Sequence, residues 1–406
     1  MNTSRRTFLT GALLGAGAAG VAAVVPSAQA DPTGTDPDQP AAAVPFHGTH
    51  QAAVLRMPAR QTSVVAFDVI AADRAELTSL LQEITDRARA LTVGGYPEPT
   101  GIAAPASDSG VLGPDVPADG LVATVGVGAS LFDDRYGLAD RKPAALTAMT
   151  TFPNDNLDPA WCHGDLLLQL SAANTDTVLH ALRDVARATR GGMQVRWRMD
   201  GFTSPPRPAG TPRNLLGFKD GTANPDMTDA ATMNRLVWAA TGKEPAWTAG
   251  GTYQVVRLIR MLVEFWDRVA VTEQENMFGR RRDTGAPLDG NAEFDVPDYT
   301  LDPEGNSIPL TAHIRRANPR TPQSDDSRIL RHGYNYDLGT DSNGNLNMGL
   351  IFTAFQQNIQ RQFEATQTRL LDEPLVDYIS PFGGGYFFAL PGVRDSTDHF
   401  GRSMLS

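Results

Sequence analysis

Two polar segments of this 406-residue chain carry residue types that can move a proton or bind a metal. Residues 214–225 read NLLGFKDGTANP and include Asp220, whereas residues 313–334 include His313 and Arg331. A carboxylate can act as a general base, an imidazole can bind a metal, and a guanidinium supplies a fixed positive charge. Asp-Gly and Asn-Pro are also strong turn formers, so the first segment by itself could equally be an ordinary turn.

The histidines and the cysteine predict no local metal cluster. The chain has seven histidines and one cysteine, Cys162, with neither a His-Glu-x-x-His nor a Cys-x-x-Cys spacing. A single cysteine excludes an internal disulfide and a cysteine cluster for zinc or iron–sulfur. His47 and His50 have the spacing of a chelating pair, but they lie in a glycine-containing segment without a neighbouring carboxylate. We therefore expect structural roles for these two side chains.

The segments with chemistry lie within a pattern of strands and helices that occurs twice. In the first half, one helix is expected to open at Asp73 and another to have Asn174 as its N-cap. Apolar runs predict strands at 64–70, 121–127, 166–170 and 193–199. The resulting order is β-α-β-β-α-β.

The second half repeats this order. A capping box from Thr272 to Glu275 predicts one helix, and Ile359, Phe363 and Leu370 share the face of another. Strands are expected at 253–261, 329–336, 348–355 and 386–390. The repeat predicts an α+β fold of two ferredoxin-like halves packed together, similar to a dimeric α/β barrel. Each sheet has one face under its own helices, so its other face needs a second sheet or a cofactor against it.

The first thirty residues have the parts of an export signal. Arg5 and Arg6 precede an apolar run at 9–25, and Ala28-Gln29-Ala30 forms a small-residue cleavage site. Paired arginines in this position are typical of the twin-arginine route, and a retained membrane anchor is the weaker interpretation. We expect export to the cell envelope, the periplasm or the extracellular space. The expected organisation is a signal peptide at 1–30, a flexible leader at 31–43, and two halves at 44–210 and 211–406.

The charge of the chain argues against two classes of partner. Cleavage of the signal removes two arginines and takes the formal net charge from −11 to −13. An acidic protein has no general electrostatic attraction to nucleic acid or to anionic lipid. No second apolar run after the signal is long enough to span a bilayer. We therefore expect no nucleic-acid partner and no integral membrane segment in the mature chain.

The motif at residues 217–221, GFKDG, resembles the Gly-x-x-Asp-Gly motif of the dye-decolourising heme peroxidases. His313 and Arg331 follow in the order typical of that family. The similarity extends over most of the mature chain, through HGTHQA at 47–52, WCHGD at 161–165, AHIRRANPR at 312–320 and GGGYFF at 383–388. The chain is most similar to the twin-arginine-exported subgroup, whose members are also called deferrochelatases. The resemblance implies two ferredoxin-like halves and non-covalent heme b in the C-terminal half, and the absence of Cys-x-x-Cys-His agrees with this.

The resemblance also implies roles for three residues. His313 is expected to be the axial ligand of the heme iron, Asp220 the distal acid/base, and Arg331 the distal cation. Asp220 and Arg331 would assist cleavage of the O–O bond of hydrogen peroxide, which leaves a ferryl heme that two one-electron donations return to rest. The base works in its ionised form, and a carboxylate keeps that form down to acidic pH. We therefore expect activity to favour acidic pH.

Further residues are expected around the cofactor. Gly221 belongs to the motif, Arg320 is a candidate partner for a heme propionate, and Asp377 resembles the carboxylate that bonds the axial histidine, with Asp372 as an alternative. His332 follows the distal arginine and could alter its pH response. Bulky donors would need radical transfer to surface aromatic residues, for which Trp197, Trp266 and Tyr336 are loose candidates, since such side chains are usually core.

Three hypotheses for function follow. The first is a secreted peroxidase that uses hydrogen peroxide to oxidise dyes, phenols or similar small donors. The second is a deferrochelatase that removes iron from heme in an iron-uptake system, where partner proteins could take part. The third is a ferredoxin-like binding module without a cofactor. A homo-oligomer is compatible with all three.

Overall fold

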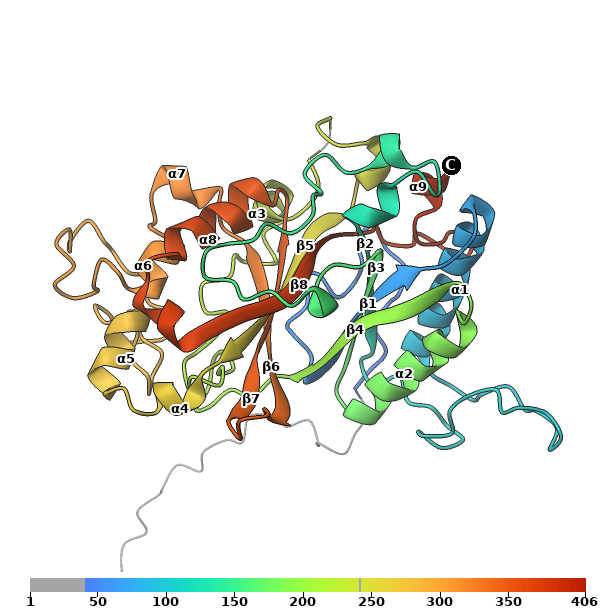
Figure 1. The fold of residues 1–406 in the computed structure, drawn as a ribbon, viewed down its shortest axis with the longest axis horizontal. Coiled ribbons are helices and arrows are strands. Elements are labelled where there is room, and N and C mark those ends of the chain that lie inside the picture. The colour runs from blue at the N-terminus through green and yellow to red at the C-terminus, as the bar shows by residue number, and fades with distance from the viewer. Residues whose placement is uncertain (1–40, 241) are drawn as a thin grey trace, which may run out of the picture. The chain divides into compact units, whose positions relative to one another are not determined.

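The computed structural model describes residues 41–240 and 242–406, so the expected signal peptide and most of the leader lie outside the described residues. Within these ranges, strands β1 to β8 form a closed barrel in the order β1-β3-β2-β8-β5-β7-β6-β4 (Figure 1). The strands are β1 (Gln61–Val69), β2 (Val122–Gly128), β3 (Leu166–Ala172), β4 (Met193–Phe202), β5 (Thr252–Met261), β6 (Leu330–Thr340), β7 (Leu346–Gln356) and β8 (Ile379–Ala389).

Both halves contribute four strands in the same relative order. The N-terminal strands lie in the order β4-β1-β3-β2, and the equivalent C-terminal strands follow in the same direction round the barrel as β8-β5-β7-β6. The halves join at two seams. Strand β2 pairs with β8 at three residue pairs, whereas β4 pairs with β6 only at Phe202 and Asn335. The expected α+β fold of two ferredoxin-like halves is confirmed, and the two sheets close into one barrel.

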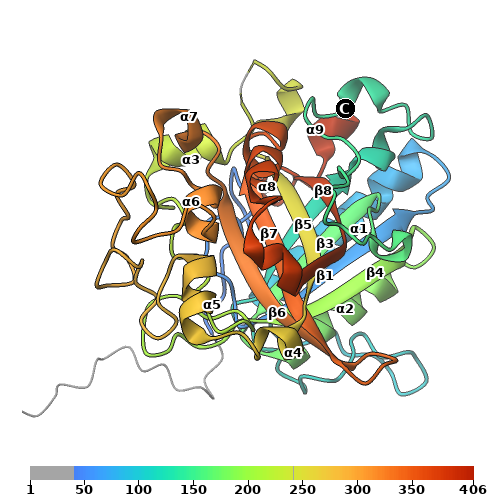
Figure 2. The same ribbon diagram turned by 60° about the vertical axis from the view of Figure 1, so that its left-hand side comes forward.

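The helices of the two halves cover different sides of the barrel (Figures 1 and 2). The N-terminal helices α1 (Arg74–Val93) and α2 (Thr175–Ala188) pack against each other on one side. The C-terminal helices α3 to α8 lie elsewhere: α3 (Ala230–Leu236), α4 (Val263–Trp266), α5 (Val271–Phe278), α6 (His313–Ala317), α7 (Pro322–Asp325) and α8 (Ala365–Leu370). The last helix, α9 (Arg402–Leu405), is the exception, because it packs against α1. No helix in the described part of the chain has the length and apolar character needed to cross a membrane.

The two N-terminal helices begin where the sequence predicts, but by different means. The Asp73 carboxylate accepts from the backbone N–H groups of Ala75 and Glu76, at 2.8 and 2.9 Å, so the predicted cap is confirmed. Asn174 is the N-cap residue of α2, yet its side chain makes no capping bond. It donates instead to the buried carboxylate of Asp119, which also accepts from the Thr177 hydroxyl.

Two details of the C-terminal helices differ from expectation. Helix α5 has Ala270 as its N-cap, and the capping box at 272–275 is not formed. Glu275 accepts instead from the backbone N–H of Arg282, at 2.8 Å, which ties the helix to the following loop. The helix expected around Ile359 and Phe363 begins as a π-helical turn, Gln360–Glu364, and continues as α8.

The barrel interior is filled by side chains from both halves. Trp197 and Tyr336 belong to this cluster with 3% and 0% of their surfaces exposed, and Trp266 lies in a separate cluster at 1%. The three aromatic residues considered for surface radical transfer are therefore core residues. As surface sites they are wrong: Trp197 and Tyr336 are on inward-facing positions of barrel strands, and Trp266, on helix α4, is buried against the Asp220 loop.

Candidate active site

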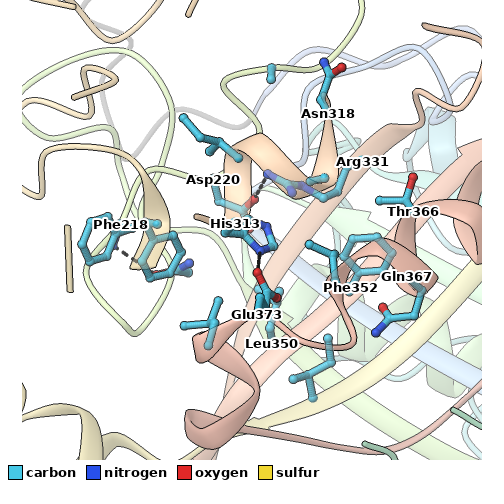
Figure 3. Close-up of a pocket in the computed structure, with 18 of the residues that line it drawn as sticks. Phe218, Asp220, His313, Asn318, Arg331, Leu350, Phe352, Thr366, Gln367 and Glu373 are labelled. Carbon is cyan, nitrogen blue, oxygen red and sulfur yellow. Dashed lines mark hydrogen bonds and ion pairs between the residues drawn. The ribbon is translucent and has the colours of Figure 1, made fainter. Parts of the chain in front are cut away.

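A cavity of about 250 Å³ lies on the outer face of the C-terminal strands, under helices α6 and α8 (Figure 3). Alternate residues of each strand face it: Arg257 and Ile259 from β5, Arg331 from β6, and Leu350 and Phe352 from β7. The intervening residues Leu258 and Ile351 belong to the barrel interior. The strand period of two thus places a polar and an apolar wall on the same side of the sheet.

His313 enters this cavity as the first residue of α6. Its Nδ1 lies 2.7 Å from Oε2 of Glu373, a side chain that is 3% exposed at the start of the 3₁₀ helix Pro374–Tyr378 (Figure 3). An ionised carboxylate can only accept, so Nδ1 carries the proton and Nε2 keeps a lone pair for a metal. The carboxylate also makes the imidazole a more electron-rich ligand.

The predicted partner of this histidine is wrong. Asp377 and its alternative Asp372 are both exposed, and Glu373 between them occupies the position beside His313. Three carboxylates within six residues look alike in the sequence, and the turn at Pro374 decides which one faces inward. No local feature of the sequence separates Glu373 from the two aspartates, because its burial depends on the packing of the whole site.

Asp220 and Arg331 meet in the same cavity. Nη2 of Arg331 lies 2.5 Å from Oδ1 of Asp220, and the two side chains are 28% and 13% exposed. Nε of Arg331 is buried and has no hydrogen-bond partner among the described residues. A guanidinium that pairs with a carboxylate and keeps one N–H free can still donate that N–H to a ligand.

The loop that presents Asp220 is held by its own polar groups. Asn214 Oδ1 accepts from the backbone N–H of Phe218, and the Asp220 N–H donates to the carbonyl of Pro212, at 3.1 and 2.9 Å. The buried Lys219 ammonium donates to the carbonyl of Thr211 at 2.8 Å. These bonds hold the loop in place where Asp220 lines the cavity.

Two other predicted cofactor residues have different positions. Arg320 lines the cavity. Gly221 is not among the lining residues; it forms the turn after Asp220 with φ of +90°, and its carbonyl accepts from Asn224 N–H at 3.0 Å. A positive φ of this kind favours glycine, which explains the residue by the turn rather than by contact with a ligand.

Positive charge accumulates at one side of the cavity. Arg280 and Arg320 both line it. Burial, together with the charges of Arg320 and Arg331, lowers the pKa of the Arg280 guanidinium from its ordinary value. The nearby Tyr299 hydroxyl is buried without a hydrogen-bond partner in the described residues, and burial raises its pKa. An anionic ligand group in the cavity would favour the charged form of Arg280.

The remaining histidines stay outside this site. His332 lines a different cavity on the barrel side of β6, and complete burial lowers its pKa to about 4. It therefore does not face the Asp220–Arg331 pair. His50 stacks on Trp238 with ring centroids 3.5 Å apart, and its Nδ1 bonds the carbonyl of Gly250. Over residues 41–240 and 242–406, no three His, Cys, Asp or Glu side chains are grouped to hold a metal ion.

The residues of this cavity fit a heme. Leu216, Phe218, Leu350, Phe352 and Phe363 supply apolar walls for a porphyrin, and His313 supplies a nitrogen for its iron. Arg257, 2% exposed, leaves its Nη1 without a partner in the described part of the chain. Arg280 and Arg320 supply the positive charge that two propionates require.

Comparison with known proteins decides the family. The profile described as "Dyp-type peroxidase, N-terminal" matches residues 51–203, and "Dyp-type peroxidase, C-terminal" matches residues 211–394. The chain belongs to the Dyp-type peroxidase family. It is therefore a heme-dependent peroxidase, and the predictions of heme and of peroxidase activity are confirmed. The hypothesis of a binding module without a cofactor is removed.

Individual relatives agree with this assignment. The deferrochelatase of Escherichia coli K12 is 50% identical over 410 residues, which cover 99% of this chain and 97% of the relative. A DyP-type peroxidase from Cellulomonas bogoriensis superposes with a TM-score of 0.81 at 36% identity, over 92% of this chain and 100% of that chain. Ferric DtpA from Streptomyces lividans gives 0.80 at 33% identity, over 89% and 97%.

Proposed function

We propose that this Dyp-type peroxidase binds heme iron through His313 and uses Asp220 and Arg331 to activate hydrogen peroxide. The observation that carries the proposal is that the His313–Glu373 pair and the Asp220–Arg331 pair face one cavity. The first pair prepares a metal ligand, and the second combines a base with a fixed cation. Because the chain belongs to a heme peroxidase family, we place the heme between these two pairs.

In this proposal the heme, when bound, supplies the iron at which peroxide is reduced and the oxidising power that two one-electron donors then consume. Asp220 accepts a proton from one peroxide oxygen and returns it to the other, which leaves as water. Arg331 stabilises the negative charge that develops on the departing oxygen. Glu373 keeps the proton on Nδ1 of His313, so that Nε2 stays directed at the metal.

We propose Arg320, with Arg280, as the partner of a heme propionate. Arg320 lines the cavity, and Arg280 is buried beside it with its pKa lowered. Because a guanidinium pairs well with a carboxylate, Arg320→Ala should bind heme more weakly without losing the axial ligand. Dyes, phenols or similar small molecules remain our proposed electron donors.

The distal roles are tested by steady-state and stopped-flow kinetics of Asp220→Asn and Arg331→Leu beside the heme-loaded parent. Each change should slow the reaction with peroxide by about 10²- to 10⁴-fold, because it removes the proton carrier or the fixed charge. Heme content, read from the Soret absorption, should stay unchanged in both variants. It should fall sharply in His313→Ala. Wild-type rates in both distal variants would show that the distal assignment is wrong.

Removal of iron from heme is a second candidate function. It is favoured by the 50% identity to proteins called deferrochelatase over nearly the whole of both chains. Both activities would use the same cavity, so the discriminating condition is the absence of peroxide. The purified protein is incubated with heme alone, and free iron and metal-free porphyrin are measured. Release of iron with intact porphyrin supports this function, and unchanged heme contradicts it.

We also propose that the chain leaves the cytoplasm by the twin-arginine route, already folded around heme. The proposal rests on Arg5 and Arg6, which lie outside the described residues, and on the cofactor, which is best loaded before export. Arg5→Lys combined with Arg6→Lys should retain the protein in the cytoplasm with heme bound. A cytoplasmic precursor without heme would contradict the order of events but not the peroxidase activity.

The domain boundaries at 44–210 and 211–406 stay a proposal, which the family matches at 51–203 and 211–394 support. A homo-oligomer and iron-uptake partners are likewise proposals. Light scattering of the purified protein measures the first, and co-purification from the native envelope tests the second.

A further inference from the structure

The barrel is weakly closed beside the active site. Strand β4 reaches β6 only at the pair Phe202–Asn335, so β4 leaves the first residues of β6 uncovered along that edge. The loop that carries Asp220 ties itself to the same strand. Asn335 Nδ2 donates to the carbonyl of Arg213 in this loop at 3.0 Å. The Asp220 loop therefore continues the seam where β4 ends.

Asn224 makes the second connection between loop and strand, and it does so at Arg331 itself. Its Nδ2 donates to the backbone carbonyl of Arg331 at 2.7 Å, and its Oδ1 accepts from the backbone N–H of Arg331 at 3.0 Å. A neighbouring strand would bond one residue through the same pair of groups. One side-chain amide thus takes the place of a strand partner at the distal arginine.

The same strand also provides the space in which the Asp220 carboxylate sits. A Cβ placed on Gly333 would lie 2.4 Å from Oδ2 of Asp220 and 3.3 Å from its Cγ. Gly333 is two residues after Arg331 and faces the same side of β6. The carboxylate therefore rests against bare backbone at one end, while Arg331 pairs with it at the other.

An ion pair by itself does not fix this arrangement. The Asp220–Arg331 contact joins two side chains that are partly exposed, and such pairs hold their partners together only weakly. It also fixes the two residues to each other but not to the sheet. The two hydrogen bonds between Asn224 and the backbone of Arg331, the Asn224–Arg331 clasp, join the loop to β6. The backbone N–H of Asn224 in turn bonds the carbonyl of Gly221, next to Asp220.

We propose that Asn224 is a positioning residue that sets the place of Asp220 relative to Arg331 and the metal site, with Gly333 as the seat of the carboxylate. This inference rests on the proposed roles of Asp220 and Arg331. It adds two residues that act through the distal pair: Asn224, which lines the cavity and bonds the backbone of Arg331, and Gly333, which faces the Asp220 carboxylate. A displacement of about 1 Å at such a pair is sufficient to slow a reaction by about 10²-fold.

The test compares Asn224→Ala and Asn224→Asp with Asn335→Ala. Asn335 is a matched control because its side chain also bonds the same loop to the same strand, but four residues from Arg331. Two quantities are measured: the second-order rate constant with peroxide in the heme-loaded proteins, and amide hydrogen exchange of peptides covering 328–336 in the heme-free proteins. The second readout does not depend on activity.

Asn224→Ala should slow the peroxide reaction on the order of 10²-fold with heme content unchanged. It should also speed exchange at the Arg331 amide, which loses its acceptor. Asn224→Asp keeps the acceptor but not the donor, so Arg331 should stay protected while the rate falls by less. Asn335→Ala should leave both quantities at the parent values.

The role of Gly333 is tested through Asp220. Gly333→Ala should slow the peroxide reaction in the parent, because the carboxylate must move away from the new methyl group. In an Asp220→Ala background the same change should have no further effect, since nothing remains to be displaced. The exchange rate at Arg331 should not change in either case. If Asn224→Ala does not fold, this pair of variants still tests whether the position of the Asp220 carboxylate sets the rate.

The results separate two failures. If Asp220→Asn reacts with peroxide as fast as the parent, the proposed function is wrong at its distal residues. If Asp220→Asn is slow but Asn224→Ala reacts at the parent rate, the positioning inference alone is overturned. Equal losses in Asn224→Ala and Asn335→Ala would also overturn it, because general docking of the loop would then be sufficient.

Discussion

His313 shows how a single contact decides which nitrogen of an imidazole carries the proton. Its Nδ1 faces the buried carboxylate of Glu373 at 2.7 Å, which directs the other ring nitrogen to the cavity. The two exposed aspartates on either side of Glu373 have the same chemistry but no such contact. Burial and direction, rather than residue type, separate the functional carboxylate from its neighbours.

At this scale we predict the effect of Glu373→Gln. An amide cannot draw the Nδ1 proton as a carboxylate does, so the imidazole becomes a poorer electron donor to iron. The reduction potential of the heme iron should rise, and the reaction with peroxide should slow. Spectroelectrochemistry measures the first effect. Asp377→Asn is the matched control and should leave the potential unchanged; an equal shift in both variants would contradict the role of Glu373.

Strand β6 is the element that separates two environments. Arg331 lines the active-site cavity and Gly333 faces the Asp220 carboxylate, whereas His332 and Tyr334 line the cavity on the barrel side. Adjacent residues with opposite surroundings follow directly from the period of a strand. The titration of His332 therefore bears on folding, not on the distal pair.

The buried His332 predicts a pH dependence of stability. Its pKa is lowered from 6.5 to about 4, so below pH 6.5 the unfolded chain binds a proton that the folded chain does not. This contribution to stability is complete above pH 6.5 and is lost as the pH falls toward 4, by up to about 3 kcal/mol. Urea unfolding of the heme-free parent and of His332→Asn between pH 7.5 and 4.5 measures it. The variant should lose stability less steeply with acid, and identical slopes would contradict the prediction.

At the scale of the whole molecule, a buried ion pair joins the two halves beside the active site. Arg257 on β5 pairs with Asp155 from the N-terminal half, and the two side chains are 2% and 1% exposed. Arg257 also lines the active-site cavity. The N-terminal half therefore supports a wall of the site although it supplies none of the proposed metal or distal residues.

Loss of this pair should be costly. Asp155→Ala leaves the Arg257 guanidinium buried and unpaired, which should lower the free energy of unfolding by about 3–5 kcal/mol. Urea unfolding of the heme-free protein measures the loss. Asp155→Ala combined with Arg257→Met should recover a large part of it, because no uncompensated charge remains. A double variant as unstable as the single one would show that packing around Asp155 matters more than its charge.

The sequence alone determined much of this protein, because the signals involved are local. Apolar periodicity identified the strands of both halves, the Asp73 cap marked a helix start, and the motif at 217–221 with His313 and Arg331 indicated the family. Such signals depend on residues a few positions apart in the chain.

Tertiary structure alone decided what depends on contacts between distant segments. The strand pairs at the two seams of the barrel, the choice of Glu373 over Asp377, and the inward direction of His332 all follow from contacts with segments far along the chain. The Asn224–Arg331 clasp spans 107 residues and leaves no periodic trace in the sequence. Burial of a side chain is a property of the packed molecule, so local spacing cannot reveal it.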